Sequence, residues 1–522
     1  MKKFCSLEGI QRSLFLAIAL SGVVFALLLL AASISVIGFE FYRAFQYGSA
    51  VLFVWFLFEV LGRFGGDWCV KREPFLIILF FFLAYLALIR FVPELGQLMM
   101  PYDSLRAQKS LESGHFAFFR PLKFYYWINY DFVLSALGML FSPKLIVGQV
   151  FNAVCRALAL YPIFKLSERV SGRRMARFVT VLAGLSPALS LYATTLVGDF
   201  TSAMFYLYAV YFFLSVPNWN AASVNNISFW ILVGLFAGMG YLFKTISFLY
   251  FAAFMVWMIF KGLECRRAKM VLLLVVSFLV IVFSHGTVKF ARSVVYNLLR
   301  TGSKVQVAQN EDFMSGILYE IYLGMCIQTG GGYSSVRDKA FRPVPMEKKL
   351  EMVKDMFVKD MDKYPRFVVD KFRAVWGTND SPGSIFYWFK MSCQKDCYNS
   401  RDRNYCVPWL VPLLRAEYLF FALMFLFGTV GFALSWRKNL NFNGMGVVSL
   451  VIVLLFAMMS MLIESHGRYR TAIYPFFFFI MPYCRIWFDA RNPLWRWIRN
   501  VMRVRNTEKT VSHSEEVEIR QN

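Results

Sequence analysis

Long apolar segments constrain this chain more than any other feature of its sequence. A helix of about 17 to 25 predominantly apolar residues can cross a bilayer, and we count about twelve such segments. They lie near residues 13–37, 47–63, 74–94, 145–166, 174–193, 200–216, 228–243, 246–261, 269–285, 410–435, 444–463 and 471–488. The sequence therefore predicts an all-α polytopic membrane protein whose extracytoplasmic loops contain short helices.

Charge sets the expected orientation. The net charge of +24 could indicate nucleic acid, but the positions of the basic residues favour membrane lipids as partners and predict no nucleic-acid partner. A cytoplasmic N-terminus, with an uncleaved first span, places nearly all basic turns inside, as the positive-inside rule requires. These turns read "GRFGGDWCVKRE", "KLSERVSGRRMAR", "KGLECRRAK" and "WRKN". Both termini are then cytoplasmic, and the tail "RNPLWRWIRNVMRVR" fits a helix on an anionic leaflet.

Six regions follow from this topology. Residues 1–94 hold the N-terminal transmembrane helices, 95–144 a first large extracytoplasmic loop, and 145–285 a transmembrane bundle. Residues 286–407 form a second extracytoplasmic segment, 408–488 the C-terminal transmembrane helices, and 489–522 a basic cytoplasmic tail. The second outer segment contains the helix-like pattern "MEKKLEMVKDMFVKDMDKYPRFVVDKFRAVW", so we expect a small ordered unit there.

The second outer segment also contains an even number of cysteines. On the oxidising side of a membrane, one or two disulfides are expected among them, with connectivity left open. The candidates are Cys326, Cys393, Cys397 and Cys406. Paired CxxC spacing is missing, so no metal site is predicted from these cysteines.

A polar stretch, "MPYDSLRAQKSLESGHFAF", follows the third apolar segment. Asp103 lies at its start, where a carboxylate could meet the headgroup of a lipid-linked substrate. Asp is also a preferred helix N-cap, so the same residue can serve as a cap, as a base, or as both.

Other charges occupy the predicted outer ends of the spans. They are Asp199 in "TTLVGDFTSAM", Lys244 in "YLFKTIS", and the group Glu464, His466, Arg468 and Arg470 in "ESHGRYR". Such charges can simply anchor helix ends. Together they suit a site that binds an anionic phosphate headgroup while a carboxylate accepts a proton from a nucleophile.

Several stretches, in order, resemble the GT-C glycosyltransferases, and within them the bacterial relatives of protein O-mannosyltransferases and lipid A aminoarabinose transferases, of the family 39 type. They are "PYDSLRAQKSLESG", the segment from "GQVFNAVCRALAL" to "TTLVGDF", "IYLGMCIQTGGGY", "YPRFVVDKFRAVWG" and "ESHGRYRTAIYPFFFFIMP". The similarity spans most of residues 95 to 490.

The resemblance implies an inverting enzyme of the outer face of the cytoplasmic membrane. It takes a sugar from a polyprenyl-phosphate donor and transfers it to a glycan, lipid or protein acceptor. Asp103 is then the catalytic base and Asp199 a second acid near the site. Lys244, His466, Arg468 and Arg470 become substrate-binding candidates. Two departures are the additional first two spans and the lack of a second acid beside Asp103, which leaves a divalent cation open as a cofactor.

Two alternatives stay open on the sequence. A transporter or flippase of lipid-linked sugars would also be polytopic, but such proteins place charges near the midplane, often in repeated halves. Here almost no charge apart from Arg156 lies near mid-span, and the sequence shows no internal repeat. A ligase or polymerase that moves whole glycans from a polyprenyl carrier would use the same face and chemistry.

Overall fold

The computed structural model describes seventeen ranges of the chain. They are residues 7–37, 41–64, 66–91, 133–134, 136–138, 140–142, 144–190, 198–216, 224–244, 246–265, 268–300, 313–329, 335–341, 343–377, 410–435, 440–463 and 473–486. All regular structure in these ranges is helical, which confirms the predicted all-α class.

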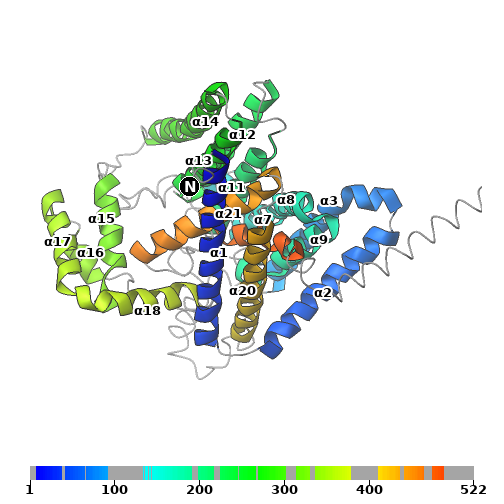
Figure 1. The fold of residues 1–522 in the computed structure, drawn as a ribbon, viewed down its shortest axis with the longest axis horizontal. Helices are drawn as coiled ribbons and strands as arrows, with labels where there is room; N and C mark the ends of the chain where they lie inside the picture. Colours follow the sequence, from blue (N-terminus) through cyan, green and yellow to red (C-terminus); the bar gives the residue numbers. More distant parts are fainter. Residues whose placement is uncertain are drawn as a thin grey trace, which may run out of the picture.

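The apolar segments form the helices of a membrane bundle (Figure 1). The first are α1 (Leu7–Ile37), α2 (Phe41–Phe64), α3 (Gly66–Phe91), α7 (Leu145–Leu158), α8 (Leu160–Ser171), α9 (Arg173–Leu185) and α10 (Pro187–Ser190). They are followed by α11 (Gly198–Leu214), α12 (Val224–Phe243), α13 (Ser247–Cys265), α14 (Ala268–Arg300), α20 (Leu410–Leu434) and α21 (Leu440–Leu462). Within the described residues, 8 helices are long and apolar enough to cross a membrane, and two shorter apolar helices lie at 201–214 and 247–263. The chain is a multi-pass membrane protein, and the predicted number of twelve spans stays a prediction.

Large apolar side chains on the outside of the bundle fit contact with lipid. Phe45, Phe53 and Phe283 are 73%, 64% and 76% exposed, whereas the same helices bury Val51 and Ile281 completely. Since a water-soluble surface rarely carries such contiguous apolar area, these faces are where lipid tails would lie.

The last apolar segment is not one continuous helix. It begins as α22 (Tyr474–Phe477), continues through turns, and ends in the short 3-10 helix η7 (Met481–Tyr483). Pro475 and Pro482 lack the N–H that a regular helix needs, and short-range bonds such as Phe479 N to Phe476 O replace part of the pattern. Irregular backbone is tolerated at membrane depth only when protein surrounds it. Residues 473–484 are indeed buried, so the phenylalanine run is packing surface within the bundle.

A helical unit from the second outer segment lies to one side of the bundle (Figure 1). It comprises α15 (Phe313–Gly324), η3 (Ile327–Thr329), α16 (Ser335–Phe341), α17 (Met346–Lys359), η4 (Met361–Lys363) and α18 (Tyr364–Trp376). We call it the outer unit. Leu318, Tyr322, Phe341 and Val353 form its own small core. The helices α17 and α18 cover the stretch for which the sequence predicts helix, and α18 reaches across to α1.

The helix at the predicted end of the transmembrane bundle is longer than its apolar segment, and the region boundaries stay predictions. The helix α14 runs without a break from Ala268 to Arg300, beyond the predicted end of the transmembrane bundle at residue 285. Its apolar, span-like part ends near Ala291.

Candidate functional site

The structure brings together two of the predicted site residues, Asp199 and Lys244. Asp199 lies in the first turn of α11, and Lys244 directly follows the last residue of α12. The Lys244 Nζ is 2.8 Å from Asp199 Oδ1, with side chains 20% and 8% exposed. Each charge complements its helix, because an acid stabilises a helix N-terminus and a base a C-terminus. The pair lies at the end of the bundle that the sequence predicts to be extracytoplasmic, which we call the predicted outer end.

Neighbouring hydroxyl groups fix the backbone on both sides of this pair. The Tyr206 hydroxyl donates to the Lys244 carbonyl at 2.7 Å, and Ser202 Oγ donates to the Asp199 carbonyl at 2.6 Å. Thr201 Oγ1 donates to Asn152 Oδ1 on α7 at 3.1 Å. The ion pair is therefore held in a hydrogen-bonded frame from three helices rather than on a loose surface.

A second cation contacts a ring that lies three residues before Lys244 on α12. Lys289 Nζ on α14 lies 4.1 Å from the centre of the Tyr241 ring, a cation–π contact. His285, only 5% exposed, packs edge-on against Tyr241 and Phe251, with ring centroids 5.4 and 5.0 Å apart. The sequence analysis missed this group as site residues. The sequence signal was the spacing of His285 and Lys289, because residues four apart share one face of a helix. Ionisable residues in apolar helices are, in addition, default functional candidates.

The remaining predicted site residues lie outside the described residues. These are Asp103, His466, Arg468 and Arg470. Of the four cysteines proposed for disulfides, only Cys326 is described, buried just after α15 at 1% exposure. Its candidate partners Cys393, Cys397 and Cys406 are not, so the disulfides stay a prediction.

Buried charges also occupy the interior of the bundle. Glu417 on α20 is 1% exposed and accepts hydrogen bonds from Ser186 Oγ at 2.6 Å and the Tyr474 hydroxyl at 2.9 Å. Arg156 on α7, also 1% exposed, donates from Nη2 to the Ala183 carbonyl at 2.8 Å. A backbone carbonyl thus accepts a hydrogen bond from the arginine that the sequence places near mid-span, which fits the rule that buried polar groups are hydrogen-bonded.

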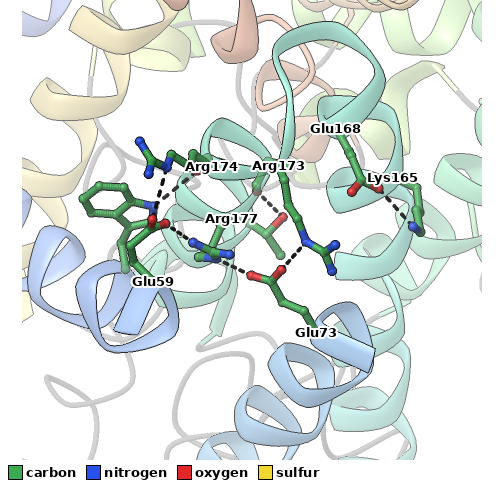
Figure 2. A network of polar contacts seen from close by, with 10 residues as sticks. Glu59, Glu73, Lys165, Glu168, Arg173, Arg174 and Arg177 are labelled. Atoms are coloured by element: carbon green, nitrogen blue, oxygen red, sulfur yellow. Dashed lines mark hydrogen bonds and ion pairs between the residues drawn. The ribbon is translucent and has the colours of Figure 1, made fainter. Parts of the chain in front are cut away.

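An ion-pair network joins helix ends that the sequence predicts to be cytoplasmic, and Figure 2 shows it from close by. Arg177 on α9 pairs with Glu59 of α2 and with Glu73 of α3. Glu73 also pairs with Arg173, and Arg174 Nε lies 3.1 Å from Glu59 Oε1. The network joins two of the turns that the sequence predicts on one membrane face, and Gly172, with φ of 77°, lets the chain reverse there.

We find no group of three or more metal-ligating side chains within the described ranges. Of the two candidate acids, Asp199 is already paired with a lysine, and Asp103 lies outside the described residues. Within the described ranges, the side chains therefore do not form a site that fits a divalent cation.

Fold and site together define an all-α multi-pass membrane protein with a charged, hydrogen-bonded cluster at one end of its bundle. The model of the dolichyl-phosphate-mannose-protein mannosyltransferase family matches residues 128–286. This range holds the Asp199–Lys244 pair and His285, and the match confirms the resemblance to GT-C glycosyltransferases.

Solved structures with a similar course of the chain are distant. The oligosaccharyltransferase AglB from Archaeoglobus fulgidus, in complex with an inhibitory peptide and a dolichol-phosphate, is 13% identical over 83% of this chain, with a TM-score of 0.40. The apo form of the Archaeoglobus fulgidus oligosaccharyltransferase gives 12% identity over 84% of this chain and a TM-score of 0.36. The chain spans about half the length of these structures, 52% and 53%. A search of curated proteins gives no match.

Proposed function

We propose that this protein is a GT-C-type glycosyltransferase that moves a sugar from a polyprenyl-phosphate donor to an acceptor at the outer face of the cytoplasmic membrane. The observation that carries the proposal is the family match over residues 128–286, because that range includes the ion pair at the predicted outer end. The acceptor is a glycan, a lipid or a protein with a reactive hydroxyl or amine.

The reaction needs a base and a group that receives the leaving charge. Asp103 is the proposed base: it takes the proton of the acceptor hydroxyl or amine, whose electron pair then attacks the anomeric carbon. The bond from that carbon to the lipid phosphate breaks, and the phosphate leaves with the bonding pair. Attack opposite the leaving group inverts the anomeric centre.

Basic side chains would stabilise the phosphate as its charge develops. We assign this role to Lys244, with His466, Arg468 and Arg470, since lysine and arginine bind phosphate through charge-assisted hydrogen bonds. The Asp199 carboxylate, 2.8 Å from Lys244 Nζ, would hold the ammonium in place. Lys289, over the Tyr241 ring one turn from Lys244, adds positive charge on the same side.

Transport of lipid-linked sugars is the second candidate, and a specific observation favours it. Glu417 and Arg156 are both 1% exposed inside the bundle, and intramembrane charges commonly mark transport paths. Their hydrogen bonds to Ser186, Tyr474 and Ala183 equally suit a structural role. Transfer and translocation differ in their products, so one preparation can separate them.

The test is sugar transfer in proteoliposomes from a panel of polyprenyl-phosphate sugars, with donor binding measured in parallel. Asp103→Asn is expected to lower turnover by about 10² to 10⁴, the usual contribution of a general base, while donor binding persists. Asp370→Asn is the matched control, because this acid of the outer unit has a side chain 58% exposed and should retain full activity. Wild-type activity in Asp103→Asn would remove Asp103 as the base, and translocation without transfer by the wild type would favour the transporter.

A further inference from the structure

Lys371 is a buried cation that joins the outer unit to the transmembrane bundle. The residue lies on α18 and is only 2% exposed. Its Nζ lies 2.5 Å from the Gly324 carbonyl, 2.9 Å from the Met461 carbonyl and 2.7 Å from the Ile463 carbonyl. An ammonium has three protons to donate, and each of these carbonyls can accept one.

All three carbonyls belong to helix C-termini. Gly324 is the last residue of α15, Met461 lies in the last turn of α21, and Ile463 follows that helix directly. The last four carbonyls of a helix lack partners within it and carry the negative end of the helix dipole. One lysine thus caps two helices from different parts of the chain, which compensates for burying its charge.

The two helix ends meet so closely that only glycine fits at the contact. A Cβ atom on Gly324 would lie 2.1 Å from the Ile463 carbonyl carbon and 2.3 Å from its oxygen. Real side chains do not approach a backbone to that distance, so any other residue would push α15 away from α21. Gly324 therefore allows the two helix ends to meet, and Lys371 joins them by hydrogen bonds.

Further hydrogen bonds extend this junction along α18. Trp376 Nε1 donates to Ser460 Oγ of α21 at 3.1 Å, and the Tyr418 hydroxyl of α20 donates to the Trp376 carbonyl at 2.6 Å. At the other end of α18, the Tyr364 hydroxyl donates to the Met325 carbonyl at 3.1 Å. The helix is thus connected to α15, α20 and α21 at once.

We propose that Lys371 is a positioning residue for the transfer reaction: by capping α15 and α21 together, it fixes the end of α21 from which the chain enters the segment with His466, Arg468 and Arg470. This inference rests on the proposed function for its catalytic consequence. Its structural part, the coupling of the outer unit to the end of α21, stands independently.

The experiment compares Lys371→Met with Lys371→Arg and Lys349→Met in nanodiscs. Lys349 is the matched control, because it is also a lysine of the outer unit, is 9% exposed, and lies 5.5 Å from the centre of the Phe341 ring in the small core. Two quantities are measured: hydrogen–deuterium exchange of the amides from Met459 to Ile463, and kcat and KM for the polyprenyl-phosphate donor.

Lys371→Met is expected to speed exchange in the last turn of α21 and to lower kcat/KM about tenfold to a hundredfold, mainly through KM, as misplaced binding groups do. Lys371→Arg should recover part of both, since it keeps the charge, and Lys349→Met should change neither. Exchange and KM in Lys371→Met equal to those of Lys349→Met would overturn the proposal.

Two further outcomes are informative. If Lys371→Met does not fold, Gly324→Ala disturbs the same junction with the charge intact; it should speed exchange at Met459 to Ile463, and unchanged exchange there would refute the coupling. If the wild type transfers no sugar, the proposed function fails, yet the exchange data still decide whether Lys371 couples the outer unit to α21.

Discussion

Removal of Arg177 should destabilise the predicted cytoplasmic end of the bundle far more than removal of its neighbour Arg174. The Arg177 side chain is 6% exposed and lies between two carboxylates that are themselves 8% and 5% exposed. Arg174 pairs with Glu59 as well, yet its side chain is 64% exposed (Figure 2). Substitution of each arginine by methionine keeps an unbranched apolar stem and removes only the charge and the hydrogen bonds.

The magnitude follows from what each change leaves behind. Breaking a buried pair by removing one partner costs about 3 to 5 kcal/mol, because the other charge stays buried without compensation. Arg173 still pairs with Glu73 and Arg174 with Glu59, so we expect the lower end, about 3 kcal/mol, for Arg177→Met. An exposed pair contributes about 0 to 1 kcal/mol, which is the expectation for Arg174→Met.

Thermal unfolding of the purified variants in one detergent gives the ranking. Arg177→Met should lower Tm clearly more than Arg174→Met, at equal expression and monodispersity. A triple variant, Glu59→Gln with Glu73→Gln and Arg177→Met, should recover most of the loss, because it removes the two buried carboxylates together with the arginine that they paired with. Equal Tm shifts for the two single variants, or no recovery in the triple variant, would refute the electrostatic explanation.

Three further predictions use other parts of the chain. In a double-mutant cycle, Asp199→Asn and Lys244→Met should be non-additive in donor KM, by at least about 0.5 kcal/mol of coupling, since the two side chains contact each other. Gly431→Ala should lower Tm, because the added Cβ would lie 2.0 Å from the Tyr483 carbonyl oxygen. Gly286→Ala should leave Tm unchanged, because a Cβ added there would have no neighbouring atom within 4 Å. Non-reducing peptide mapping of protein from an oxidising compartment should show at least one disulfide among Cys326, Cys393, Cys397 and Cys406.

The transmembrane helices could be predicted from the sequence because hydrophobic length is itself the physical requirement for a span. The helices of the outer unit were predictable for a related reason, since residues 346–376 alternate apolar and charged positions with helical spacing. The irregular backbone of the last apolar segment could not be predicted from the sequence. Its composition satisfies a hydropathy criterion, but two prolines and burial by other helices allow an irregular course instead.

The sequence predicted which residue types make up the candidate site, but it predicted only some of the contacts among them. Asp199 and Lys244 were both selected as charges at predicted outer ends, and they form an ion pair across two helices. Lys371 was not selected, because within "YPRFVVDKFRAVWG" it looks like one more exposed lysine of an amphipathic helix. Its partners are backbone carbonyls from residues 324, 461 and 463, and backbone groups leave no signature in side-chain identity.

The two ends of the bundle arrange their charges differently, and this difference bears on where the proposed transfer can occur. At the predicted cytoplasmic end, arginines and glutamates neutralise one another between α2, α3 and α9, so that end is held rigidly by side-chain pairs. At the predicted outer end, Lys244 pairs with Asp199, Lys371 contacts the carbonyls of two helix C-termini, and Lys289 faces an aromatic ring. These lysines contribute positive charge to one end of the bundle, and positive charge favours an anionic ligand. This is the electrostatic condition that a departing lipid phosphate requires.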